Sequence, residues 1–137
     1  MSKTLNVGDS ATIEHAFSAE EVRQYAELAK DFNPIHLDPE FAAQTQFGQP
    51  ICHGMLVASL FSGLLGQKLP GEGAIYMGQD IQFKAPVFID QPVTARVEIT
   101  SIRADKPIVE LTTTCTDADG KVLVTGKAVT FVPWLQA

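Results

Sequence analysis

The stretch GMLVASLFSGLLGQKL, residues 54–69, is apolar on nearly every side of the helix that it would form. A helix that is apolar all round is usually buried, and this one is shorter and richer in glycine than a membrane-spanning helix of ~20 residues. Small residues recur along it and would let a sheet approach closely; they are Gly54, Ala58, Ser59, Ser62, Gly63 and Gly66. The stretch therefore predicts one long helix enclosed by the rest of the domain.

The chain after residue 74 changes to a period of two and is rich in β-branched residues, which is typical of strands. The pair Asp119-Gly120 predicts a hairpin turn before the last strand. The predicted strands are IYMGQDIQF (75–83), PVTARVEITSI (92–102), PIVELTTTCTD (107–117) and KVLVTGKAVTFV (121–132). We expect them to form an antiparallel meander that wraps the apolar helix.

The chain before the apolar helix is predicted to contain a short edge strand and two further helices. Residues 12–18 (TIEHAFS) form the strand, and the capping-box sequence SAEE starts a helix at Ser18 that runs to about Lys30. Pro34 prevents this helix from continuing, because proline has no N–H and restricts the residue before it. Asp38, which proline follows, caps the next helix.

Helices followed by a run of strands indicate an α+β domain. A long central helix held in a curled antiparallel sheet describes the hotdog fold, and this is the fold that we expect. At 137 residues, of which 45% are hydrophobic, the chain is long enough to bury a single core, so one domain over residues 1–137 is predicted.

Composition excludes several classes of function. The formal net charge of −6 argues against a nucleic-acid surface, because nothing neutralises phosphates in bulk. No stretch approaches the ~18 apolar residues of a membrane span, and the N-terminus lacks the apolar run of a signal peptide. Cys52 and Cys115 have no CxxC spacing, which favours reduced thiols and a cytoplasmic protein.

The stretch KDFNPIHLD, residues 30–38, places a carboxylate and an imidazole close together around a proline. On a continuous helix Asp31 and His36 would point in different directions, since only positions three or four apart share a face. The break at Pro34 frees both side chains to face one point, while Asn33 satisfies loop backbone groups or holds a water. A purely structural turn, with a helix-terminal aspartate and a packed histidine, is the alternative for this pattern taken alone.

Two segments around this turn resemble the MaoC-like hydratases, in particular the short single-domain (R)-specific enoyl-CoA hydratases that supply polyhydroxyalkanoate synthesis. They are AKDFNPIHLDPEFA and QPICHGMLVASLFSGLLGQKLPGEGAIYMGQDIQFKAPVFIDQPV, and the resemblance runs from about Leu5 to about Val132. The family motif G-D-x-N-P-[LIV]-H-x-D is matched from Asp31 to Asp38. Lys30 departs from it, because the family usually has glycine at that position.

The resemblance implies that the protein hydrates a trans-2-enoyl-CoA to the (R)-3-hydroxyacyl-CoA, without a metal, nucleotide or redox cofactor. Asp31 and His36 would share one catalytic water and exchange its protons, and the sequence does not say which of them is the base. The backbone N–H of Gly54, at the start of the apolar helix, would stabilise the enolate oxygen. The resemblance also implies a homodimer.

Five further residues are candidates for binding the substrate. His53 would orient the loop, and Ser62 and Leu65 would line or floor an acyl tunnel. Lys84 and Arg103 would hold the phosphates of CoA, since the mouth of a thioester site needs cations. Each also has a structural reading: the first three as packed residues, and the two cations as charges at strand ends.

A metal site is not expected, because His15, His36 and His53 lack the spacing of metal ligands. Three alternative functions remain: a dehydratase that acts on acyl-carrier-protein substrates, an acyl-CoA thioesterase, and a non-catalytic acyl-CoA-binding module. A thioesterase commonly carries its carboxylate on or near the central helix, and residues 54–69 contain none. The acid–base pair argues against a non-catalytic module.

Overall fold

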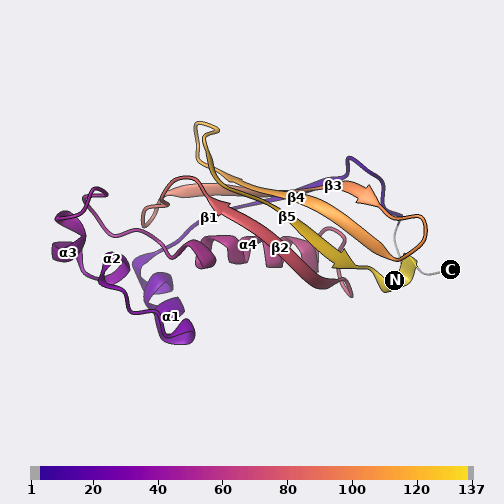
Figure 1. The fold of residues 1–137 in the computed structure, drawn as a ribbon. Helices are drawn as coiled ribbons and strands as arrows, with labels where there is room; N and C mark the ends of the chain where they lie inside the picture. Colours follow the sequence, from indigo (N-terminus) through magenta and orange to yellow (C-terminus); the bar gives the residue numbers. More distant parts are fainter. Residues whose placement is uncertain (1–3, 136–137) are drawn as a thin grey trace.

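The computed structural model describes residues 4–135, which form one five-stranded antiparallel sheet in the order β1-β3-β4-β5-β2. The long helix α4 lies along one face of this sheet, and the three shorter helices gather at one end (Figure 1). The strands are β1 (Ser10–Ala16), β2 (Ile75–Phe83), β3 (Pro92–Ile102), β4 (Ile108–Thr116) and β5 (Val122–Phe131). The helices are α1 (Ala19–Ala29), α2 (Pro34–Leu37), α3 (Pro39–Ala43), α4 (Gly54–Gln67) and the 3-10 turn η1 (Pro133–Leu135).

The core lies between α4 and the concave face of the sheet. Alternate residues of β3 and β4 are buried there, in keeping with the period of two, and they meet the apolar side of α4. The largest fully buried side chains include Phe61 and Leu64 of α4, Ile99 of β3 and Leu111 of β4. The α+β hotdog fold predicted from the sequence is confirmed.

The prediction of a continuous meander was wrong for one strand. β3, β4 and β5 pair in chain order, but β2 pairs with β5 at the far edge of the sheet, so the chain crosses over after β2. The hairpin between β4 and β5 is confirmed, with Gly120 at a φ of 84°. Period-two patterning locates strands but does not select their partners, because every one of these strands offers the same alternation.

The central helix begins at Gly54 as predicted, but it is not buried all round. Met55 is 58% exposed, and Ser59 and Ser62 also face solvent. A single sheet covers only one side of a helix, so the other side of α4 stays open in the single chain. Between residues 4 and 135 no helix combines the length and apolar character needed to cross a membrane.

The predicted capping box at the start of α1 is confirmed. Ser18 Oγ accepts a hydrogen bond from the Glu21 N–H at 3.1 Å, and the Glu21 carboxylate accepts one from the Ser18 N–H at 3.0 Å. The helix ends at Lys30, which has a φ of 64° in the left-handed region. Pro34 then begins the short helix α2 instead of lying in a loop, because proline suits the first position of a helix.

The conformation of Lys30 explains why the family motif has glycine at this position. A residue with a Cβ atom pays about 1 kcal/mol or more in the left-handed region, and glycine does not. We therefore expect Lys30→Gly to stabilise the protein by about 1 kcal/mol in urea denaturation. Ala29→Gly, one residue earlier and inside α1, is the control, and we expect it to destabilise by about 1 kcal/mol. Equal effects of the two substitutions would contradict this account.

Candidate active site

The loop between α1 and α2 is held by its own side chains. The Asp31 carboxylate accepts a hydrogen bond from the Asn33 N–H at 3.2 Å, and the Asn33 side-chain oxygen accepts one from the Ile35 N–H at 3.2 Å. Asn33 is thus the N-cap of α2, and Asp38 caps α3 in the same way. These caps fix the directions in which Asp31 and His36 leave the backbone.

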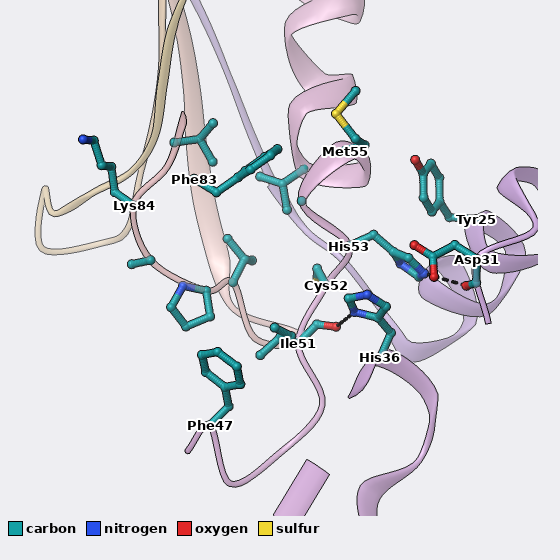
Figure 2. A pocket seen from close by; sticks show the side chains of 16 residues that line it. Tyr25, Asp31, His36, Phe47, Ile51, Cys52, His53, Met55, Phe83 and Lys84 are labelled. Carbon is teal, nitrogen blue, oxygen red and sulfur yellow. Dashed lines mark hydrogen bonds between the residues drawn. The ribbon is translucent and has the colours of Figure 1, made fainter. Parts of the chain in front are cut away.

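Asp31 and His36 both line a cavity of about 500 Å³ between α4, the end of β2 and the helices at one end of the sheet. Figure 2 shows their side chains facing each other on one side of this cavity, with Phe83 and Lys84 on the opposite side. The remaining lining residues are mostly apolar and are Tyr25, Phe47, Ile51, Cys52, His53, Gly54, Met55, Val57, Ala85, Pro86, Val87 and Val124.

Asp31, His36 and His53 converge within this cavity, with one nitrogen or carboxylate oxygen from each lying within 4.8 Å of the others. His36 Nδ1 lies 2.7 Å from the Ile51 carbonyl oxygen. A carbonyl only accepts, so Nδ1 carries the proton and the other ring nitrogen, Nε2, has a free lone pair. A water that donates to two acceptors at about 2.8 Å each spans about 4.5 Å between them, and the ligand atoms of this cluster lie within a similar distance of one another.

The environment of His36 favours its neutral form. Burial lowers the pKa of His36 below its ordinary value of 6.5, and the nearby His53 ring lowers it further. The hydrogen bond to the Ile51 carbonyl and the Asp31 carboxylate act in the opposite direction, but burial dominates. Near neutral pH, His36 therefore offers an unprotonated nitrogen as a proton acceptor.

His53 contacts both members of the pair. It is 2% exposed, and its Nε2–H donates to the backbone carbonyl oxygen of Asp31 at 3.0 Å. Its ring stacks on the ring of His36, with centroids 3.8 Å apart and an interplanar angle of 28°. The centroid of its ring also lies 4.8 Å from that of the Tyr25 ring. His53 is therefore part of the site, on the side of the cavity that holds Asp31 and His36.

Gly54 begins α4 and also lines the cavity. The N–H groups of a first helical turn have no partner inside the helix, and the helix dipole makes this end positive. A Cβ atom at this position would lie 2.7 Å from the ring of Phe83. Glycine therefore lets the Phe83 ring pack against the start of α4, where any side chain would collide with it.

The other predicted substrate-binding residues fall into two groups. Lys84 follows β2 and lines the cavity with an exposed side chain. Ser62, Leu65 and Arg103 lie outside the cavity. Ser62 faces solvent on α4, Leu65 is buried in the core, and the Arg103 guanidinium forms an ion pair with Asp105 at 2.8 Å.

Sequence reasoning missed the groups that shape the cavity from outside the motif. Phe83 follows the pattern of a strand residue, and only its place at the end of β2 brings it opposite Gly54. Ile51 acts through its backbone carbonyl, which carries no signal in the sequence. Tyr25 of α1 fits a helical pattern, and only the fold brings its ring beside that of His53.

Among the described residues, one cluster of side chains could also offer ligands to a metal ion, and it consists of Asp31, His36 and His53. A metal binds an imidazole nitrogen along its lone pair, close to the plane of the ring. Two rings stacked at 3.8 Å and 28° have nearly parallel planes, so their lone pairs do not meet at one ion. The geometry suits a bridging water better than a metal.

A hotdog domain with an acid–base pair at the end of an apolar cavity defines the class of this protein. Residues 4–120 match the family model for the MaoC like domain, and the chain belongs to this family. It is 56% identical to the (R)-specific enoyl-CoA hydratase of Aeromonas caviae, over 96% of this chain and 98% of that protein. It is 44% identical to the (R)-specific enoyl-CoA hydratase of Rhodospirillum rubrum, over 92% of this chain and 87% of that protein.

Solved structures agree with this assignment. The (R)-hydratase from A. caviae involved in PHA biosynthesis superposes with a TM-score of 0.93 at 55% identity, covering 96% of this chain and 100% of the other. An R-hydratase from Pseudomonas aeruginosa in the unliganded form superposes with a TM-score of 0.88 at 34% identity, covering 93% of this chain and 82% of that one.

Proposed function

We propose that this protein adds water to a trans-2-enoyl-CoA and forms the (R)-3-hydroxyacyl-CoA at the Asp31–His36 pair. The observation that carries the proposal is the convergence of this pair on one side of a largely apolar cavity, in a chain 56% identical to an (R)-specific enoyl-CoA hydratase. The protein is an enzyme, a hydro-lyase. It supplies (R)-3-hydroxyacyl-CoA for polyhydroxyalkanoate synthesis.

The residues divide the reaction into three tasks. Asp31 and His36 hold one water and remove a proton from it as its oxygen bonds to Cβ of the substrate. The pair returns a proton to Cα, so the double bond receives H and OH in total. The thioester oxygen, which gains negative charge in the enolate, lies at the backbone N–H of Gly54. Because Asp31 and His36 interact closely, their protonation is a property of the pair.

The proposed reaction uses no cofactor, because CoA enters as part of the substrate. Lys84 stands exposed on the side of the cavity opposite the pair, where it can meet a phosphate of CoA. The stacked histidines favour water over a metal ion, so we propose that catalysis is independent of metals. Two buried cysteines that form no disulfide are consistent with a cytoplasmic enzyme.

The proposed function is tested with crotonyl-CoA, following the loss of absorbance of the conjugated thioester. We expect rapid hydration, a product of (R) configuration, and an unchanged rate after dialysis against EDTA. Release of free thiol without loss of the double bond would identify a thioesterase, and no reaction would identify a binding module. A much higher rate with crotonyl attached to acyl-carrier protein would identify that carrier as the natural one.

We also propose that two copies of the chain form a homodimer through β2. This strand is an edge of the sheet and exposes apolar side chains, with Ile75 53% and Met77 58% accessible to solvent. An exposed apolar edge strand is a ready surface for pairing with a second copy. We expect light scattering to give the mass of a dimer, and Met77→Lys to weaken it more than Val122→Lys. An active monomer would contradict this proposal.

A further inference from the structure

One ring nitrogen of His53 has no hydrogen-bond partner among the described residues, although it is buried. This atom is Nδ1, and it differs from the Nε2 atom that donates to Asp31. Burying a polar atom without a partner costs about 1–3 kcal/mol, so a residue needed only for packing would better be apolar. His53 also provides no side-chain cap for α4, although it occupies the N-cap position. Neither packing nor helix capping therefore accounts for a histidine at position 53, which leaves a role in the active site.

The contacts of His53 join the two groups on which the proposed reaction depends. One ring nitrogen holds the backbone of Asp31, and the face of the same ring supports the ring of His36. The side chain is 2% exposed, so it has little freedom to move. A shift of His53 would displace Asp31 and His36 together.

We propose that His53 is a positioning residue that fixes the Asp31 backbone and the His36 ring relative to each other. The proposal rests on the hydration function given above. Nε2 donates to the Asp31 carbonyl, and Nδ1 is the ring atom that has no partner among the described residues.

The titratable groups that face His53 are Tyr25 of α1, Asp31 of the loop and His36 of α2. Cys52 precedes it and lines the same cavity, where burial raises the pKa of the thiol to about 12, so this thiol is uncharged near neutral pH. The ring of His53 covers one face of the His36 ring. Burial is also the main cause of the lowered pKa of His36.

Two substitutions separate the two contacts. His53→Phe keeps a ring to stack on His36 but loses the donor, whereas His53→Gln keeps an N–H donor but loses the stacked face. We expect each to lower kcat by about 10- to 100-fold, because small displacements of catalytic groups have effects of this size. KM should change by less than about threefold. His15→Phe is the matched control outside the cavity and should keep kcat within about twofold of the wild type.

The titration of the His36 ring, followed by NMR, gives a readout that does not need hydration activity. We expect its midpoint below 6.5 in the wild type and a rise toward 6.5 in His53→Gln, where water reaches the ring. An unchanged His36 titration, with kcat unchanged or reduced only in proportion to the folded fraction, would overturn the positioning role. A wild-type protein that does not hydrate enoyl-CoA would instead overturn the proposed function, and the titration would still decide the role of His53.

Discussion

Asp31→Ala and His36→Ala are each expected to lower kcat for enoyl-CoA hydration by about 10²- to 10⁴-fold, the usual contribution of a positioned acid or base. Either substitution removes one of the two acceptors that hold the water, so the remaining group can neither orient the water nor complete both proton transfers. Stopped-flow or steady-state loss of the enoyl absorbance measures the effect. The midpoint of thermal unfolding should fall by only a few degrees, because each substitution removes one hydrogen bond, to the Asn33 N–H or to the Ile51 carbonyl, worth about 1 kcal/mol.

Matched controls are available outside the cavity for both substitutions. Asp119 lies exposed in the β4–β5 turn, where its side chain makes none of the turn's hydrogen bonds, so Asp119→Asn should leave the rate unchanged. His15→Ala removes a histidine that contacts Glu21 at 3.0 Å, away from the cavity. If Asp31→Ala and His36→Ala both hydrate the substrate as fast as these controls, the proposed mechanism is wrong.

The pH dependence of the rate follows from the lowered pKa of His36. The neutral ring is the active form, so kcat/KM should fall as pH drops through a value below 6.5 and stay high above it. In the His36→Ala variant this acidic limb should disappear from the small activity that remains. The sign is fixed by the direction of the shift, because a lowered pKa keeps the ring neutral to a lower pH.

Gly126→Ala is expected to cause the largest loss of stability, about 3 kcal/mol, with a fall in melting temperature of about 10 °C. Gly126 of β5 pairs with Ile81 of β2, and a Cβ atom at Gly126 would overlap the carbonyl oxygen of Asp80. It would also lie 2.8 Å from the Gln79 side-chain nitrogen, which donates to Thr113 Oγ1 at 2.9 Å. Because the overlap is with backbone, it cannot be relieved by a change of rotamer.

Gly78→Ala is the control for this substitution. Gly78 lies in the neighbouring strand β2, and a Cβ atom there would meet no atom within 4 Å. We expect it to change the free energy of unfolding by less than about 1 kcal/mol. Chemical denaturation of both variants measures the difference. A Gly126→Ala protein as stable as Gly78→Ala would show that β2 and β5 lie farther apart than they do here.

The elements that the sequence predicted well are those with a local signal. The strand 75–83 and the start of α4 at Gly54 lie where their patterns placed them, and the capping box at Ser18 is present. The Asp31–His36 pair was also recognisable, because a specific motif surrounds it. The family resemblance then gave the fold and the reaction, both of which the comparisons support.

Other features had no local signal. The sequence placed β2 in a meander, whereas it lies at the edge beside β5, since all the strands share one alternation. The apolar sequence predicted that α4 is enclosed, whereas Met55 and Ser62 are exposed. Residue type alone does not show on how many sides a helix is covered. Ser62, Leu65 and Arg103 were candidates by chemistry alone, and the fold places them outside the cavity.

By itself the sequence determined the elements and the acid–base motif, because periodicity, capping and turn chemistry act between residues near in the chain. The reaction class followed from the resemblance of that motif to the MaoC-like hydratases. The tertiary structure alone decided how the pair works. It brought the carbonyl of Ile51 to His36, and it brought His53 into contact with the His36 ring and the Asp31 carbonyl. The two hydrogen bonds join residues 15 and 22 positions apart, and each is accepted by a backbone carbonyl, which every residue has. The residue types therefore give no sign of them.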